Sequence, residues 1–113
     1  MKSSTLKTNR DFRRVYNRGK SVLMPSIVLY KLPTRHPINR IGFTVSNKIG
    51  NAVTRNRIRR RLREAYRLNE DRIKEGFDLV IVARHKSVES DYKSLESELI
   101  DALSFLGLIE TEM

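Results

Sequence analysis

The chain has 113 residues, 39% of them apolar, which suits one domain (residues 1–113) with a single modest core. Its formal net charge of +10 favours a polyanionic partner, and the absence of cysteine excludes disulfides and thiolate chemistry. Residues 1–20 lack the apolar segment of a signal peptide, and no run approaches the roughly 20 apolar residues that span a bilayer, so we expect a cytoplasmic protein with no membrane partner.

The first predicted element is a short helix near residues 8–19. Thr8 and Asp11 have the spacing of a helix-capping pair, and Gly19 provides a C-terminal stop. Between them an apolar face repeats at helical spacing, formed by Phe12, Val15 and Tyr16. The other face carries Arg13, Arg14 and Arg18, so the helix is expected to pack by one side only.

Two strands are predicted next, at residues 26–32 and 40–46. In the first, alternation places Ser26, Val28, Tyr30 and Leu32 opposite Ile27, Leu29 and Lys31. Pro25 predicts that this strand lies at an edge of the sheet or carries a bulge near its start. Because the two strands are consecutive, we expect them to pair as a hairpin.

A long helix is predicted from an N-cap at Asn51 to about Arg72. Six of the nine residues from Arg55 to Arg63 are arginine. An apolar stripe nevertheless runs through the segment at three- and four-residue spacing, comprising Ile58, Leu62, Ala65, Tyr66 and Ile73. The opposite side presents Asn56, Arg60, Arg63 and Arg67 in a line. The pattern predicts a folded helix with its back in a core and a row of guanidinium groups facing out.

The C-terminal third completes an α+β pattern. Residues 78–84 form a nearly continuous apolar run, typical of a buried strand. Ser90 or Asp91 is expected to cap a last helix, which Gly107 closes. The apolar stripe of this helix comprises Tyr92, Leu95, Leu99, Ala102, Leu103 and Leu106. The element order is helix, strand, strand, helix, strand, helix.

The arginine-rich helix predicts nucleic-acid binding. Residues 1–67 hold 18 of the 23 basic residues and only 2 of the 13 acidic ones. Arginine donates paired hydrogen bonds to phosphate and stays charged. A merely solvated face is disfavoured, because so many like charges destabilise an isolated helix by repulsion. A helix on a membrane surface is disfavoured too, because the apolar stripe is needed to dock on the strands.

The segment from Lys48 to Arg67, KIGNAVTRNRIRRRLREAYR, resembles the signature of the bacterial ribonuclease P protein family, in which the Arg55-Asn56-Arg57 triplet is the hallmark. Asp11-Phe12, SIVLY, GFTVS and DLVIVAR match in order, over roughly residues 7 to 106. The resemblance implies a two-layer αββαβα sandwich of a kind also found in ribosomal proteins. It also implies a left-handed β-α-β crossover.

The resemblance further implies a subunit of a ribonucleoprotein endoribonuclease that matures the 5′ end of tRNA. The partners would be the catalytic RNA of ribonuclease P and the single-stranded 5′ leader of precursor tRNA. The RNA would perform the hydrolysis with bound Mg²⁺, so we expect no catalytic residue and predict no metal site in the polypeptide. The expected RNA-binding residues are Lys48, Arg55, Asn56, Arg57, Arg59, Arg60, Arg63 and Arg67.

A second site is expected between the first helix and the sheet. Exposed aromatic rings beside cations stack unpaired bases. The resemblance assigns the leader to a cleft lined by Phe12, Tyr16, Ser26, Val28 and Tyr30. From the residues alone, core packing is the alternative, because any short helix needs an apolar face such as Phe12 and Tyr16 to dock on a sheet.

Two other functions remain open at this stage. A structural RNA-binding protein of ribosomal type would also be basic and compact, although it requires no aromatic cleft. A DNA-binding regulator is disfavoured, because base readout uses a few placed side chains rather than a dense arginine array. His36 and His85 have no nucleophile or ligand cluster near them in sequence, so both are expected at the surface.

Overall fold

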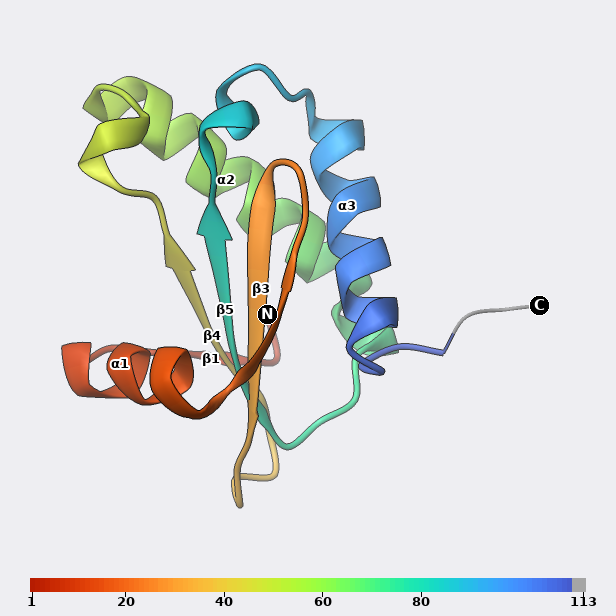
Figure 1. The fold of residues 1–113 in the computed structure, drawn as a ribbon. Helices are drawn as coiled ribbons and strands as arrows, with labels where there is room; N and C mark the ends of the chain where they lie inside the picture. Colours follow the sequence, from red (N-terminus) through yellow and green to blue (C-terminus); the bar gives the residue numbers. More distant parts are fainter. Residues whose placement is uncertain (111–113) are drawn as a thin grey trace.

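The computed structural model describes residues 1–110, whose helices and main strands follow the predicted order (Figure 1). The helices are α1 (Asn9–Arg18), α2 (Ala52–Asn69) and α3 (Tyr92–Phe105), with 3-10 turns η1 (Asn47–Ile49), η2 (Glu70–Arg72) and η3 (His85–Val88). The strands are β1 (Ser4–Thr5), β2 (Lys20–Leu23), β3 (Ile27–Pro33), β4 (Arg40–Thr44) and β5 (Phe77–Ala83). The sequence predicts neither β1 nor β2, since two and four residues are too few to show an alternating pattern.

The strands form one sheet in the order β1-β4-β5-β3-β2. The central strand β5 runs parallel to β4 and antiparallel to β3. The predicted hairpin between β3 and β4 is therefore wrong. The intervening strand β5 is almost entirely apolar, and such a strand is most stable where both its faces are covered. Of the two alternatives predicted from Pro25, the edge position of β3 is wrong, because β2 pairs with the outer side of β3 and Pro25 lies in the turn between them.

The connection from β4 through α2 to β5 joins two parallel strands. In Figure 1 both strands point upward, β5 lies to the right of β4, and α2 passes behind the sheet. This path is left-handed, as the resemblance implied, and it departs from the strong preference for right-handed crossovers. The handedness determines which face of the sheet receives the arginine-rich helix.

Helices contact both faces of the sheet. On one face α2 and α3 pack together, completing the predicted sandwich around a core that includes Ile27, Leu29, Ile41, Leu79 and Ile81. On the opposite face α1 covers a smaller cluster of Leu6, Val15 and Val80. The upper part of this second face has no helix in front of it (Figure 1). Within residues 1–110, none of the helices is both long enough and apolar enough to cross a bilayer.

Helix α2 has the predicted orientation. The Asn51 side chain caps it by accepting a hydrogen bond of 2.9 Å from the backbone N–H of Thr54. The predicted stripe of Ile58, Leu62, Ala65 and Tyr66 has no exposed surface. The α-helix ends at Asn69 rather than at Arg72, because the chain tightens into η2 over the last three residues.

The N-terminal segment is fastened to the end of α2. A carboxylate oxygen of Glu70 accepts a hydrogen bond of 2.7 Å from the backbone N–H of Lys2, and the other accepts one of 2.8 Å from that of Ser3. The Ser3 hydroxyl contacts both Glu70 and the buried Tyr66 hydroxyl. Burial pushes the pKa of Glu70 up, but these hydrogen bonds outweigh it and hold the pKa below its ordinary value. This anchor positions β1 beside β4.

Candidate nucleic-acid interface

The outer side of α2 presents a row of polar and cationic side chains. The predicted residues that are exposed are Lys48 of η1 and Asn56, Arg57, Arg60, Arg63 and Arg67 of α2. Ile58 and Leu62, on the opposite side of the helix, are 0% exposed. Because the apolar side is locked into the main core, the cationic side forms a surface of fixed position.

Three arginines of this helix are oriented by hydrogen bonds to the protein itself. A guanidinium nitrogen of Arg55 donates to the Gly50 carbonyl oxygen at 2.6 Å, and one of Arg61 donates to the Ser90 carbonyl oxygen at 2.9 Å. Arg59 donates to the Asn56 side-chain oxygen at 2.9 Å. Arg55 thus joins the start of α2 to the turn before it, and Arg61 joins α2 to the segment before α3.

The remaining arginines of α2 differ in how far contacts within the protein hold their side chains. The Arg63 guanidinium lies 5.6 Å from the centre of the Phe43 ring, which favours a cation–π contact. Arg67 pairs with Glu64 at 2.5 Å, and its hydrogen bond holds the pKa of Glu64 below the ordinary value. Arg57 and Arg60 form no ion pair or hydrogen bond with other side chains in the part of the chain that the structure describes. These two are the most available for an external phosphate.

On the other face of the sheet, α1 brings the three predicted rings together. The centres of Tyr16 and Tyr30 are 5.0 Å apart in an edge-to-face arrangement, and those of Phe12 and Tyr16 are 6.4 Å apart. The Tyr16 hydroxyl lies 2.7 Å from the Thr44 hydroxyl. Phe12 sits directly on Gly42, where a Cβ atom would come within 2.5 Å of the ring. Phe12 and Tyr30 are both half-buried against the cluster of Leu6, Val15 and Val80, whereas Tyr16 is 36% exposed.

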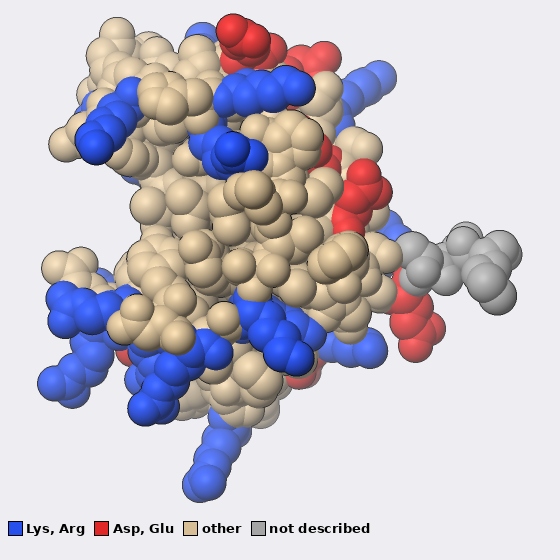
Figure 2. Space-filling view, in the orientation of Figure 1, with Lys and Arg blue, Asp and Glu red and all other residues tan. Residues whose placement is uncertain are grey.

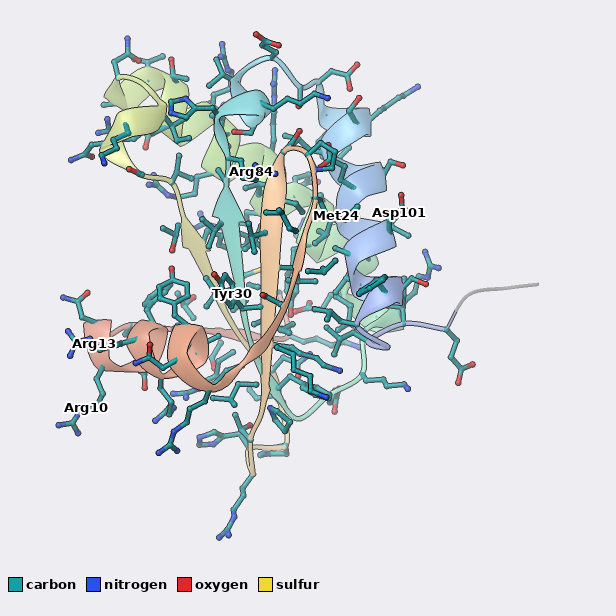
Figure 3. All side chains as sticks on the ribbon, in the orientation of Figure 1. Arg10, Arg13, Met24, Tyr30, Arg84 and Asp101 are labelled. Atoms are coloured by element: carbon teal, nitrogen blue, oxygen red, sulfur yellow. The ribbon has the colours of Figure 1, made fainter. Side chains whose placement is uncertain are left out.

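Beside these rings the sheet face is concave. Val28, Val82 and Thr44 form one row across β3, β5 and β4, and all three are half-buried. Figure 2 shows this region as a hollow without charged residues, bounded above and below by lysine and arginine side chains. Figure 3 places Tyr30 near its floor, Arg84 above it and Arg13 at the side of α1. We call this region the aromatic hollow.

The upper margin of the aromatic hollow contains a further cavity of about 420 Å³ between η1 and η3. Cations contribute to its lining, namely Lys48, Arg84 and Lys86. Lys48 thus lies between the aromatic hollow and the start of α2. An apolar floor with cationic margins fits an unpaired strand, whose bases stack while its phosphates contact the margins.

The structure does not bring Ser26 to the aromatic hollow, which corrects the prediction for this residue. Ser26 has no exposed surface, and its hydroxyl lies 2.9 Å from that of Ser90. Its backbone N–H donates to Glu98 of α3 at 2.8 Å. The strand begins at Ile27, so Ser26 belongs to the preceding turn and the alternation of faces does not reach it.

Sequence reasoning missed several residues of the aromatic hollow. Thr44 and Val28 lie on either side of Val82 only because β5 separates β3 from β4. The alternation of residues 78–84 does place Val80 and Val82 on one face, but it does not reveal which strands lie next to them. Arg84 was missed because it follows the strand, where no pattern indicates a binding role.

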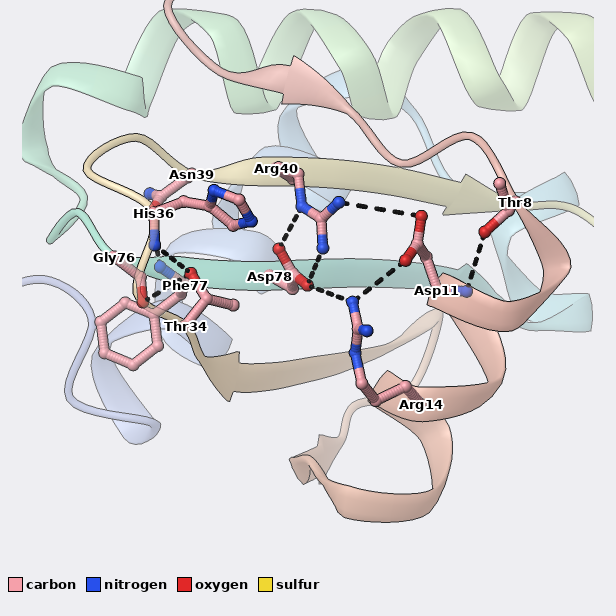
Figure 4. A network of polar contacts seen from close by, with 10 residues as sticks. All are labelled: Thr8, Asp11, Arg14, Thr34, His36, Asn39, Arg40, Gly76, Phe77 and Asp78. Carbon is pink, nitrogen blue, oxygen red and sulfur yellow. Dashed lines mark hydrogen bonds and ion pairs between the residues drawn. The ribbon is translucent and has the colours of Figure 1, made fainter.

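An ion network around the buried Asp78 fastens α1 to the sheet (Figure 4). Arg40 donates two hydrogen bonds, of 2.8 and 2.7 Å, to the two carboxylate oxygens of Asp78, which has no exposed surface. Arg14 of α1 reaches the same carboxylate at 3.4 Å and Asp11 at 3.0 Å. The Thr8 side chain, followed by Arg40 and Arg14, holds the pKa of Asp11 below its ordinary value. No sequence motif predicts this network.

Both histidines lie at the surface, as predicted: His36 in the β3–β4 connection and His85 at the start of η3. In residues 1–110 no three His, Asp or Glu side chains are grouped so as to hold a metal ion. The features that do stand out are therefore a fixed array of guanidinium groups and a hollow with an aromatic floor.

Together these two surfaces define a basic α+β protein of the nucleic-acid-binding class. The family described as Ribonuclease P matches residues 1–107 of the chain. The chain belongs to the ribonuclease P protein family.

Known ribonuclease P proteins resemble this chain in sequence and in fold. A ribonuclease P protein component of Clostridium botulinum (strain Loch Maree / Type A3) is 48% identical over 109 residues, covering 96% of this chain and 98% of that protein. One of Alkaliphilus oremlandii is 42% identical, covering 94% and 93%. The solved RNase P protein of Staphylococcus aureus superposes with a TM-score of 0.88 at 30% identity, covering 96% and 100%. That of Thermotoga maritima gives 0.79 at 30% identity, covering 87% and 93%. The α+β class predicted from the sequence is confirmed.

Proposed function

We propose that this chain is the protein subunit of ribonuclease P and acts in the cytoplasm on precursor tRNA. It binds the catalytic RNA of that enzyme through the outer side of α2. It holds the single-stranded 5′ leader of precursor tRNA in the aromatic hollow. The observation that carries the proposal is the orientation of α2, in which Ile58 and Leu62 are fully buried while Arg57 and Arg60 are exposed and have no ion-pair partner within residues 1–110.

The arginine row supports RNA binding through its chemistry. Each planar guanidinium donates two parallel hydrogen bonds to a phosphate, and each contact releases condensed counterions. Arg55, Arg59 and Arg61 are already oriented by their own hydrogen bonds, so less side-chain freedom is lost on binding. The row faces away from the aromatic hollow side of the sheet, which allows two RNA segments to bind at once.

In this proposal Mg²⁺ belongs to the catalytic RNA, where it supplies the hydrolytic chemistry. The polypeptide contributes binding and orientation only. Tyr16 and Tyr30 offer ring surfaces to leader bases, and Lys48 and Arg84 at the margin offer cations to leader phosphates. Neutralising phosphates in this way lowers the Mg²⁺ concentration at which the complex assembles.

A structural protein of ribosomal type remains the second candidate, because its basic surface would be equally dense. The aromatic hollow favours the first function, since packing against folded RNA needs no apolar channel with exposed rings. The two functions differ in one measurable respect, which is dependence on the length of a single-stranded leader.

Reconstitution tests the proposal. The protein is added to ribonuclease P RNA at low Mg²⁺, and cleavage is followed for precursors with a leader of several nucleotides or of one. We expect cleavage to depend on the protein and binding to be tighter for the longer leader. Stimulation that is absent, or identical for both leaders, would contradict the subunit role or the leader role respectively.

A further inference from the structure

Cations also gather on the side of α1 that faces away from the aromatic hollow. Arg10, Arg14 and Arg18 follow one another at four-residue spacing, which puts them along one side of the helix. Figure 3 shows Arg10 extending outward from α1, away from the sheet. The β3–β4 connection adds Arg35 and His36 to the same region, across a hollow of about 430 Å³. We call Arg10, Arg14, Arg18, Arg35 and Arg40 the far-side surface.

Two carboxylates neutralise only part of this surface. Asp78 and Asp11 bind Arg40 and Arg14, and these contacts fix both guanidinium groups at the wall of the hollow. Arg10, Arg18 and Arg35 are exposed, and no ion pair to them occurs within residues 1–110. Confining so many cations without matching carboxylates is unfavourable unless an external anion binds.

The far-side surface differs in chemistry from the aromatic hollow. Four arginines, His36 and Thr34 line its hollow together with Leu32 and Pro33, and no tyrosine or phenylalanine is among the lining residues. Stacking of unpaired bases on exposed rings is therefore a property of the other side of α1. From Arg10 to Arg18 the helix rises by about 12 Å, a length that meets several successive phosphates. Double-helical RNA is bound largely through its phosphates and shape.

We propose that the far-side surface is a second RNA contact that takes the phosphate backbone of double-helical RNA. The inference rests on the proposed function, because it assumes that the chain works within an RNA complex. The helical RNA belongs either to the catalytic RNA or to the folded body of the tRNA, and both offer the same phosphate rows. Helix α1 then lies between two RNA segments, with unpaired leader on one side and helical RNA on the other.

The test uses the double variant Arg18→Gln/Arg35→Gln, since both side chains are exposed and neither forms an ion pair within residues 1–110. Arg72→Gln/Lys93→Gln removes two exposed cations elsewhere and serves as the matched control. Arg57→Gln/Arg60→Gln reports on the arginine row. Binding of catalytic RNA to the protein, and of mature tRNA and long-leader precursor to the reconstituted complex, is measured across a salt series.

We expect the far-side variant to weaken binding of catalytic RNA or of mature tRNA by about tenfold or more near 0.15 M salt, and to reduce the salt slope by about 2. A loss on catalytic RNA, or a loss that is equal for mature tRNA and precursor while binding of catalytic RNA is unchanged, supports the inference and identifies the source of the helical RNA. Unchanged binding of both, or a loss seen only with the long leader, overturns it. If Arg57→Gln/Arg60→Gln also leaves every affinity unchanged, the proposed function itself fails.

Discussion

Helices α1 and α2 both carry arginines and pack on the same sheet from opposite faces, but they are attached by different means. Four side chains of α2, from Ile58 to Tyr66, are completely buried in the main core. Helix α1 buries only Val15 completely and depends in addition on the ion network around Asp78. Apolar packing therefore holds α2 and its cations in place, whereas α1, beside the aromatic hollow, is also held by ion pairs to the buried Asp78.

The largest effect on stability is expected from removing the Asp78 carboxylate, which holds α1 to the sheet through Arg14. Asp78→Ala leaves Arg40 and Arg14 facing a void and should lower the free energy of unfolding by about 3 kcal/mol, the lower end for a broken buried pair because both arginines retain some solvent contact. Urea unfolding followed by circular dichroism measures it. Asp71→Ala, which removes an exposed carboxylate, is the control and should change little. Wild-type stability for Asp78→Ala would show that apolar contact alone holds α1.

The second prediction concerns the arginine row. Arg57→Gln/Arg60→Gln should weaken binding of catalytic RNA by about tenfold or more near 0.15 M salt, because two phosphate contacts and their counterion release are lost. The slope of affinity against salt should fall by about 2. Thermal unfolding is expected to be unchanged, since neither side chain contacts the core. An unaltered slope would mean that these arginines contact only solvent.

The third prediction tests whether the aromatic hollow binds the leader. Tyr30→Ala should weaken binding of a long-leader precursor by about 1–2 kcal/mol, the loss of one stacked base, and leave binding of mature tRNA unchanged. Tyr30→Phe keeps the ring and should bind like the wild type. Phe12→Leu is less informative because its ring also seats α1 on Gly42. Equal weakening for precursor and mature tRNA, with the fold intact, would refute the leader assignment.

The smallest effect tests the N-terminal anchor. The folded protein lowers the pKa of Glu70, so this group stabilises the fold above its ordinary pKa of 4.5 and the contribution disappears as pH falls through the lowered folded-state value. Glu70→Gln should therefore reduce stability by about 1 kcal/mol at pH 7 and by progressively less as the pH falls below 4.5. Exposed Glu75→Gln is the control. A difference that does not change with pH would assign the effect to packing.

Local patterns were sufficient for the arginine row but not for the aromatic hollow. The cap at Asn51 and the stripe from Ile58 to Tyr66 follow from spacing within one helix. The pairing of β5 between β3 and β4 depends on contacts between residues far apart in sequence, and the expected hairpin was wrong for that reason. The burial of Ser26 and the partners of Asp78 depend on the same pairing. A single sequence does not encode register between distant strands in any short pattern.

Gly42 sets the height of α1 above the strands. A methyl group there would lie 2.5 Å from the Phe12 ring, so any larger residue must lift or tilt the helix. The ring cannot slide aside freely, because Leu6 also lies within 3.3 Å of the same point. The absence of a side chain at Gly42 therefore sets how closely α1 approaches the sheet, and with it the width of the aromatic hollow beside the helix.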